Sequence, residues 1–335
     1  MTFVLGIDIG HSVVKLAHGE DTEGQPARAM ILPATACRAD EGAPIRTHRN
    51  PHGDGPCAVL IDGNTWIAGA PWRSLRLPRP PRQLSHDFPE TKTYRALLYA
   101  GLWKTGRTVI DRLVTSLPAV RTLAPADMAN LKWRLEGVHE VAPGRSVEVR
   151  EAVIQPHPVG PFMDLRQGLE RSWKDPDTKA LVIDVGYFTV DWAVITTGGY
   201  VGKKSRGSSV WAVSYICGFV REAVSRDYRL TLSDDEIEEI LRSGNSAIRL
   251  QNDLVDLAPY LARALDEVTD AALTEIRNAL RFEERVPDIL VFAGGGAKFF
   301  RDKVAQAFPS SEVVVPEDPL VSSAVGLWRL GVQWA

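Results

Sequence analysis

Two short acidic segments, 176 residues apart, share one pattern. Residues 8–10 (DIG) and 184–186 (DVG) each place a carboxylate at the end of an apolar run, directly before a glycine. Glycine permits the backbone conformations that let successive turn N–H groups point at an anion. Two carboxylates facing one gap repel each other unless a cation lies between them, and Mg²⁺ needs only one or two carboxylates plus phosphate oxygens. The pair therefore predicts a phosphate site with Mg²⁺ held by Asp8 and Asp184.

The alternative for each segment is an Asp-x-Gly hairpin that binds nothing. For one motif that alternative is the simpler interpretation, but repetition at a fixed offset favours a paired site. The same offset relates Val14 to Val190 and Ala17 to Ala193. This internal repeat predicts that the two halves of the chain share one arrangement of elements. Lys15 follows the first turn and could neutralise phosphate charge.

A glycine run, 294–296, follows an apolar strand pattern and precedes a helical run that begins at Ala297. Three glycines remove every Cβ between a sheet edge and a helix N-terminus, which suits a nucleoside lying against bare backbone. A Rossmann fingerprint is a poor match, because that motif opens the first βα unit of its domain. An ordinary turn is the other interpretation.

Strand and helix patterns alternate along the chain, which predicts an α/β protein. Residues 3–17 and 180–195 each read as a strand, a tight turn and a second strand. Residues 233–236 form a capping box that begins a helix. Further strand patterns occur at 58–69, 112–118, 147–156 and 288–293. Helical spacing of apolar residues occurs at 91–106, from 125, at 213–227, 261–280 and 320–330.

Composition narrows the class of protein. A length of 335 residues favours two domains. A formal charge of −3 disfavours an electrostatic grip on nucleic acid, so we expect no direct nucleic-acid binding. Three widely spaced cysteines exclude a disulfide framework or a Cys-rich zinc site and fit a reducing cytoplasm. With no basic leader and no run of 18 apolar residues, we expect neither export nor a membrane partner.

A stretch rich in Pro, Gly, Arg and His, 33–89, interrupts the first half and is interpreted as an inserted subdomain or long loop region. Within it, four arginines spaced by three predict an extended basic strip. A solvated loop is the simpler interpretation, and a subunit or adaptor contact is the sharper one. The sharper hypothesis predicts that charge reversal weakens assembly and leaves nucleotide affinity intact. The four residues are Arg73, Arg76, Arg79 and Arg82.

Together these motifs resemble those of the actin, Hsp70 and sugar-kinase superfamily. Residues 6–15 (GIDIGHSVVK) are similar to its first phosphate motif, 180–195 (ALVIDVGYFTVDWAVI) to its second, and 290–300 (LVFAGGGAKFF) to its adenosine motif. The compact length and the segments RLVTSLP, REAVIQPHPVGPFMD and PEDPLVSSAVGLWRLG are most similar to plasmid-segregation actins of the ParM/StbA type. Some features resemble the ParM-like member of the plasmid-borne PRTRC gene system.

This resemblance implies a two-lobed actin-like, ribonuclease H-like α/β fold. Its duplicated mixed-sheet domains would enclose a nucleotide cleft between them. Domain I would span 1–160 with the inserted subdomain at about 33–89, and domain II would span 161–335. A C-terminal helix at about 320–331 would return to domain I.

The resemblance also implies roles for single residues. Asp8 and Asp184 would organise Mg²⁺ and its waters, and Lys15 would contact phosphate. Gln155 lies where the family places the Gln or Glu that orients the attacking water, unless it is an ordinary strand-end residue. Asp191 matches a second polar position near that water. The expected phosphate ligands are Gly10, His11, Ser12, Gly186, Tyr187 and Thr189. The expected adenosine ligands are Gly294, Gly295, Gly296 and Ala297, with Arg242 beside the base or ribose.

Two departures from the family pattern concern the phosphate pocket. His11 stands where actins usually have Ser or Thr, and the pair Tyr187-Phe188 replaces small residues. Bulky side chains at these positions would make the lining of the phosphate pocket differ from the family pattern. They also leave open whether the nucleotide is ATP or GTP.

The function implied is a cytoplasmic actin-like ATPase that polymerises with ATP and disassembles after hydrolysis. Such a filament would move plasmid DNA through a DNA-binding adaptor protein. One alternative is a small-molecule kinase of the same fold, which would need an Asp base. No acid between the two phosphate motifs has clear context for that role. A second alternative is a nucleotide-binding scaffold with little hydrolysis, which His11 and Tyr187 would allow.

Overall fold

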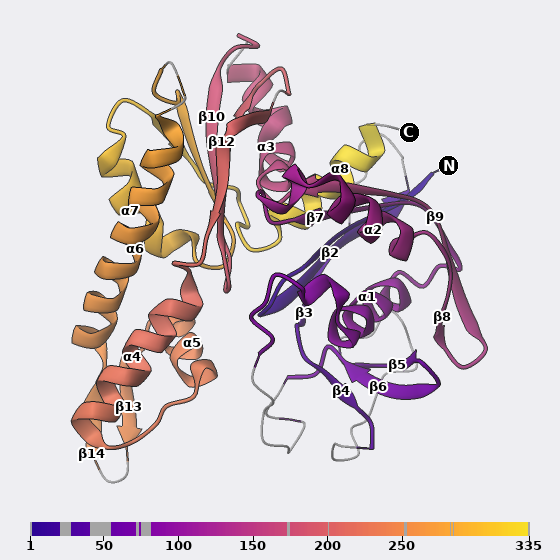
Figure 1. Ribbon diagram of the computed structural model, residues 1–335, viewed down its shortest axis with the longest axis horizontal. Helices are drawn as coiled ribbons and strands as arrows, with labels where there is room; N and C mark the ends of the chain where they lie inside the picture. Colours follow the sequence, from indigo (N-terminus) through magenta and orange to yellow (C-terminus); the bar gives the residue numbers. More distant parts are fainter. Residues whose placement is uncertain are drawn as a thin grey trace.

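The computed structural model describes residues 2–20, 28–40, 55–71, 74, 82–172, 175–199, 201–250, 253–281, 283 and 285–333. Its elements form two lobes, each built around one large sheet (Figure 1). The first lobe, indigo to purple, contains the N-terminus, and the second runs from pink to orange.

The first large sheet has the strand order β3-β2-β1-β7-β9-β8. Its central strand, β1, pairs antiparallel with β2 and parallel with β7. All seven residues of β1 are buried, as expected for a strand covered on both faces. The strands are β1 (Phe3–Ile9), β2 (Val13–Glu20), β3 (Arg28–Pro33), β7 (Val109–Leu117), β8 (Gly137–Ala142) and β9 (Arg145–Pro156).

The second large sheet repeats the centre of the first. Its order is β12-β11-β10-β15-β16, and β10 pairs antiparallel with β11 and parallel with β15. The repeat seen in the sequence therefore corresponds to a repeated arrangement of three strands. The strands are β10 (Lys179–Val185), β11 (Val190–Thr196), β12 (Val201–Ser209), β15 (Ile289–Ala293) and β16 (Glu312–Val314).

The two hairpins place their acids at equivalent points. Asp8 lies opposite Lys15 in the first hairpin, and Asp184 lies opposite Asp191 in the second. Each turn closes with a glycine N–H that donates to a carbonyl three residues later, over 3.1 Å at Gly10 and 2.9 Å at Gly186. The turns are therefore alike in geometry and differ in charge.

The remainder of the first lobe covers this sheet and adds a small one. Helix α1 packs on β5 of a three-stranded sheet of order β4-β6-β5, which lies in the stretch interpreted as an insertion. Thr91 caps α1, since its Oγ1 accepts from the Tyr94 N–H over 3.1 Å. The elements are β4 (Ala36–Arg38), β5 (Cys57–Ile61), β6 (Asn64–Ala68), η2 (Phe88–Glu90), α1 (Lys92–Lys104), η3 (Arg121–Leu123) and α2 (Pro125–Leu135).

Helices of the second lobe bury one apolar cluster against its sheet. The predicted capping box is confirmed, because the Ser233 and Glu236 side chains each accept from the other residue's backbone N–H. This box fixes the start of α5, where Asp234 Oδ2 accepts a hydrogen bond from the Tyr187 hydroxyl of the second hairpin turn over 3.3 Å. The elements are α4 (Val213–Tyr228), α5 (Asp234–Ser243), β13 (Ala247–Leu250), β14 (Asp253–Asp256), α6 (Ala258–Leu280) and α7 (Ala297–Ala307).

Two helices, α3 (Val159–Ser172) and α8 (Ser322–Gln333), lie between the two large sheets. Helix α8 packs on β1, β2 and β7 and also on α3. Buried side chains from both sheets meet these helices in one cluster, which includes Val4, Val182 and Leu327. The pair therefore joins the lobes at the base of the cleft. Within the described part of the chain, no helix has both the length and the apolar character needed to cross a bilayer.

Candidate functional site

A cleft of about 370 Å³ lies between the lobes and is lined by both hairpin turns, α5 and the start of α7. This volume is typical of a small-ligand site. Of the residues that sequence analysis predicted for the nucleotide site, all but Gln155 line this cleft. The predicted residues that line it are Asp8, Gly10, His11, Ser12, Lys15, Asp184, Gly186, Tyr187, Thr189, Asp191, Arg242, Gly294, Gly295, Gly296 and Ala297.

Asp8 is already paired in this cleft. Its Oδ2 accepts from Lys15 Nζ over 2.7 Å and from Ser323 Oγ over 2.9 Å. Burial alone would raise the pKa of Asp8, but Lys15 and His157 outweigh it and lower that pKa to about 2. Burial likewise opposes the charge on Lys15, yet Asp8 and Asp184 raise its pKa. Both groups therefore stay charged at neutral pH.

Asp184 is buried without the partners that satisfy Asp8. Its Oδ1 accepts no hydrogen bond from the described residues. Burial, only partly offset by Lys15, raises the pKa of Asp184 to about 6. An unpaired buried carboxylate oxygen is unfavourable unless a cation or a donor from a ligand reaches it. Asp184 therefore fits a metal-bound phosphate group.

No three metal-ligating side chains gather at one point among the described residues. A Mg²⁺ site here would therefore combine Asp184, and in part Asp8, with phosphate oxygens and waters. That division is typical of Mg²⁺ bound with a nucleotide. The donor set fits the ion on chemistry, because both groups are hard oxygen ligands.

Asp191 has a different role from the other acids, because its acceptors are all used. Its Oδ1 accepts from the Ala119 N–H over 2.8 Å and from Ser208 Oγ. Its Oδ2 accepts from Thr189 Oγ1 over 2.7 Å and from His157 Nδ1 over 3.1 Å. A carboxylate with four donors is a fixed orienting group. Asp191 therefore positions Thr189 and His157 and has no free oxygen for a metal.

His157 lines the cleft, whereas Gln155, the predicted water-orienting residue, is not among the described lining residues. Gln155 lies on β9 opposite Ser116, and the chain leaves the strand at Pro156. Burial alone would lower the pKa of His157, but Asp191 raises it to about 9. The ring is therefore a cation at neutral pH, and its Nε2 has no hydrogen-bond partner among the described residues.

The unusual bulky residues of the two turns contact each other across the cleft. The His11 ring lies 4.5 Å from the Phe88 ring and 4.7 Å from the Phe188 ring, measured between centroids. Burial lowers the pKa of His11 to about 4, so it is neutral at physiological pH. His11 and Phe188 line the cleft, and Phe88 packs behind His11. These bulky side chains therefore form a contact between the two lobes.

The three glycines at 294–296 are not all required for the same reason. Gly294 has φ +83°, and a Cβ there would overlap Asp184 Oδ1. A Cβ at Gly296 would lie 2.5 Å from Val185 Cγ1. A Cβ at Gly295 would make only an ordinary contact, with Leu320 Cδ1 at 3.4 Å as its nearest neighbour. Packing therefore explains two of the glycines, and only Gly295 leaves bare backbone toward the cleft.

The basic strip is described at one residue only, since Arg73, Arg76 and Arg79 lie outside the described residues. For Arg82 the interpretation as a solvated loop residue is wrong. Its side chain is 12% exposed and contacts two carboxylates of α5. The reason is that α5, far along the chain, brings its acidic first turns to the same place.

The residues at the cleft that sequence analysis missed include three polar ones, His157, Glu238 and Ser323. His157 stands in a Pro-His-Pro segment that reads as a loop. Glu238 lies on the helix that the capping box predicts, so its face could have been derived from helical spacing. Ser323 had no local signal, because its contact with Asp8 joins positions 315 residues apart.

Both halves of the chain match families of actin-like proteins. Residues 6–160 match the family described as actin like proteins N terminal domain. Residues 182–306 match the archaeal actin homologue MreB-like, C-terminal family. The chain therefore belongs to the actin-like proteins. No curated protein matches the sequence.

Solved structures of actin-like proteins share the fold over its whole length. The archaeal actin homologue Ta0583 in complex with ADP has a TM-score of 0.74 at 19% identity, with 100% of each chain covered. A ParM filament subunit from Clostridium botulinum has a TM-score of 0.72 at 16% identity, with 99% of each chain covered. Alp7A has a TM-score of 0.69 at 15% identity, with 100% of this chain and 97% of Alp7A covered. The predicted actin-like α/β fold is confirmed.

Proposed function

We propose that this protein is a cytoplasmic ATPase that binds Mg²⁺-ATP in the cleft between its lobes and assembles into filaments. The observation that carries the proposal is the pair of matched turns, with Asp8 and Asp184 lining one cleft and a buried Asp184 oxygen left unpaired. Structural neighbours support both parts, because one is an ADP complex and two are filaments. Plasmid or DNA segregation is part of the proposal, by analogy with the ParM structures.

The residues divide the cleft into two ends. The turns at Gly10 and Gly186, with Lys15, form a cationic and N–H-rich end for the phosphates. Gly295, Ala297 and Arg242 form the other end, where the start of α7 leaves room for the nucleoside. Bound Mg²⁺ would supply charge neutralisation for the phosphates. ATP is the proposed nucleotide, with GTP as the alternative that the lining does not distinguish.

We infer that His157, and not Gln155, is the catalytic group at this end of β9, with a role in stabilising charge. Its charge, held in place by Asp191, can stabilise negative charge that develops on the transferring phosphoryl group. A protonated ring has no acceptor, so it cannot serve as the base for water. Hydrolysis in this site would therefore depend on positioning and charge.

We predict that His157→Ala slows ATP hydrolysis about 100-fold, the order of effect for a group that acts only in the transition state. ATP affinity should change less than about threefold, because ground-state contacts remain. Wild-type turnover should hold through pH 8 and fall as His157 loses its proton near pH 9. Phosphate release against pH measures both.

Gln155→Ala is the matched control two residues away, and we expect near wild-type turnover. An equal loss of turnover in both variants would mean that the end of β9 supports the structure of the site and takes no part in the chemistry. Normal turnover in His157→Ala would remove the residue from the mechanism.

Assembly is the second part of the proposal and follows from nucleotide lying between two lobes. A γ-phosphate that contacts both turns biases the angle between them, and that angle decides whether subunits fit a filament. A formal charge of −3 favours a DNA-binding adaptor protein over direct DNA contact.

The test combines light scattering after addition of ATP and Mg²⁺ with phosphate release without any acceptor. We expect scattering to rise and then decay as phosphate is released. Phosphate transfer only when a small-molecule acceptor is added would indicate the kinase. Nucleotide binding with neither signal would indicate the scaffold, and no nucleotide binding would overturn the proposal.

A further inference from the structure

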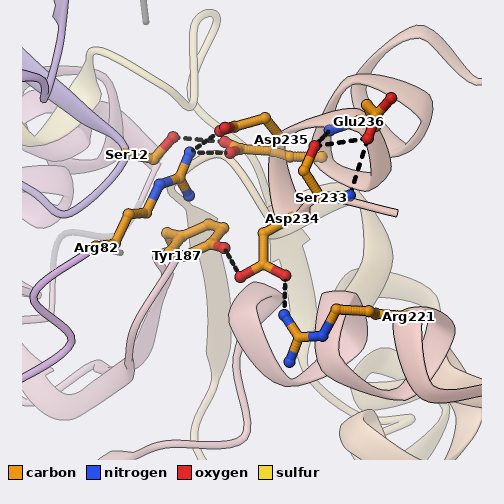
Figure 2. Close-up of polar contacts among 9 residues, drawn as sticks. Ser12, Arg82, Tyr187, Arg221, Ser233, Asp234, Asp235 and Glu236 are labelled. Atoms are coloured by element: carbon orange, nitrogen blue, oxygen red, sulfur yellow. Dashed lines mark hydrogen bonds and ion pairs between the residues drawn. The ribbon is translucent and has the colours of Figure 1, made fainter. Parts of the chain in front are cut away.

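One arginine bridges the two lobes at the edge of the cleft. Arg82, in the segment before α1, donates from Nη2 to Asp235 Oδ1 over 2.8 Å and to Glu238 Oε2 over 2.6 Å. Both acceptors lie on α5 of the second lobe. Figure 2 shows Arg82 between Ser12 and Asp235, with the Tyr187 ring beside it. We call Arg82, Asp235 and Glu238 the cross-lobe clasp.

The clasp is shielded from water, so its charges interact more strongly than those of a surface pair. The side chains are 12% exposed at Arg82, 8% at Asp235 and 21% at Glu238. The guanidinium carbon also lies 3.8 Å from the centroid of the Tyr187 ring. Since Tyr187 belongs to the second phosphate turn, the arginine contacts that turn as well as α5.

The clasp also reaches the first phosphate turn through Glu238. Ser12 Oγ donates to Glu238 Oε1 over 2.5 Å, so one carboxylate receives Ser12 on one oxygen and Arg82 on the other. Ser12 is one of the proposed phosphate ligands, and it has a single hydroxyl hydrogen to donate. A phosphate that takes this hydrogen must displace Glu238 from Ser12.

What then happens to Glu238 depends on Arg82. A carboxylate left beside phosphate without a counter-ion is repelled, whereas one held by a guanidinium is neutralised. Phosphate binding at Ser12 would therefore shift Glu238 from a shared position to full pairing with Arg82. The second carboxylate, Asp235, accepts from the same Arg82 nitrogen and anchors the arginine to α5.

We propose that the cross-lobe clasp controls nucleotide release, with Arg82 as a positioning residue that holds the lobes together while phosphate occupies Ser12. The inference rests on the proposed nucleotide site. It gives one arginine of the basic strip a role at the cleft and separates it from assembly contacts.

The experiment measures release of a fluorescent ATP analogue, in Mg²⁺, from full-length protein chased with unlabelled ATP. We expect Arg82→Gln to speed release about tenfold, the effect of losing a partly buried charged hydrogen bond. Arg82→Lys should restore most of the wild-type rate, because it keeps the charge. Arg95→Gln is the matched control, since Arg95 pairs with Asp62 outside the cleft, and it should stay within about twofold of the wild-type rate.

A double-mutant cycle distinguishes a clasp from separate effects. Asp235→Asn should speed release by a smaller factor, and the double variant should release no faster than Arg82→Gln. If the effects of the two substitutions on the release rate multiply in the double variant, the inference is overturned. A wild-type release rate in Arg82→Gln would also overturn it. Either result would leave the nucleotide site intact. Failure of wild-type protein to bind the analogue would overturn the proposed function itself.

Discussion

Asp184→Asn should make the nucleotide-free protein more stable at pH 8 and inactive. The pKa of Asp184 is raised from 3.8 to about 6, because its carboxylate is buried with one oxygen unpaired. The stability that comes from this raised pKa is fully present below pH 3.8 and is lost progressively as pH rises through 6. Above pH 6, the ionised group therefore opposes folding.

Asparagine has nearly the same shape and stays neutral, so the variant should gain about 1 to 3 kcal/mol at pH 8. The gain should vanish near pH 4, where wild-type Asp184 is protonated. Urea unfolding at pH 4 and 8 measures both values. Asp302→Asn, at an exposed ion pair, is the control and should change stability by less than about 0.5 kcal/mol at either pH.

The same change should reduce Mg²⁺-dependent hydrolysis at least about 100-fold, because a neutral amide is a poor ligand for Mg²⁺. A functional carboxylate that destabilises its own fold is expected at a site organised around a cation. A pH-independent change in stability, or a loss at pH 8, would show that Asp184 is a structural acid.

How far the sequence could predict this site depended on how local each signal was. Each hairpin turn is encoded within a dozen residues by an apolar run, an acid and a glycine, and both form as predicted. The capping box at Ser233 is equally local. The glycine run was predicted to be part of the site, although close packing explains two of its three glycines.

Features that depend on long-range contacts were missed. Helix α3 begins at Val159, where sequence analysis predicted no element, and it has Gly160 and Pro161 in its first turn. Gly160 packs against α8, since a Cβ there would lie 2.6 Å from the Ser323 carbonyl oxygen. His157 follows a proline after the strand ends, and the family resemblance pointed to Gln155 on the strand instead. Arg82 is fixed by acids more than 150 residues away, which no local pattern contains.

The second large effect concerns the contact between the two helices that join the lobes. Gly326→Ala should destabilise the protein by about 3 kcal/mol or more, since overpacking against backbone leaves nothing able to move aside. A Cβ at Gly326 would overlap the Gly160 carbonyl and lie 2.7 Å from the Asp164 nitrogen. The gain in helix propensity, about 1 kcal/mol, is too small to offset this.

Gly218→Ala in α4 is the matched control, because its Cβ would meet only Arg221 Nη2, at 3.9 Å. That variant should be neutral or gain up to about 1 kcal/mol. Thermal unfolding of both variants gives the comparison, and equal stability of the two would contradict tight helix packing at the base of the cleft.

The effect of Gly326→Ala should also reach the site. Ser323 lies one turn before Gly326 on α8, and its hydroxyl donates to Asp8 Oδ2 and accepts from Lys15 Nζ over 3.2 Å. A methyl group that moves α8 away from α3 therefore shifts a partner of the Asp8–Lys15 pair. Nucleotide affinity measured below the unfolding temperature should fall, whereas Gly218→Ala should keep it. Unchanged affinity in a destabilised Gly326→Ala would mean that the helix contact supports folding alone and that Ser323 tolerates its movement.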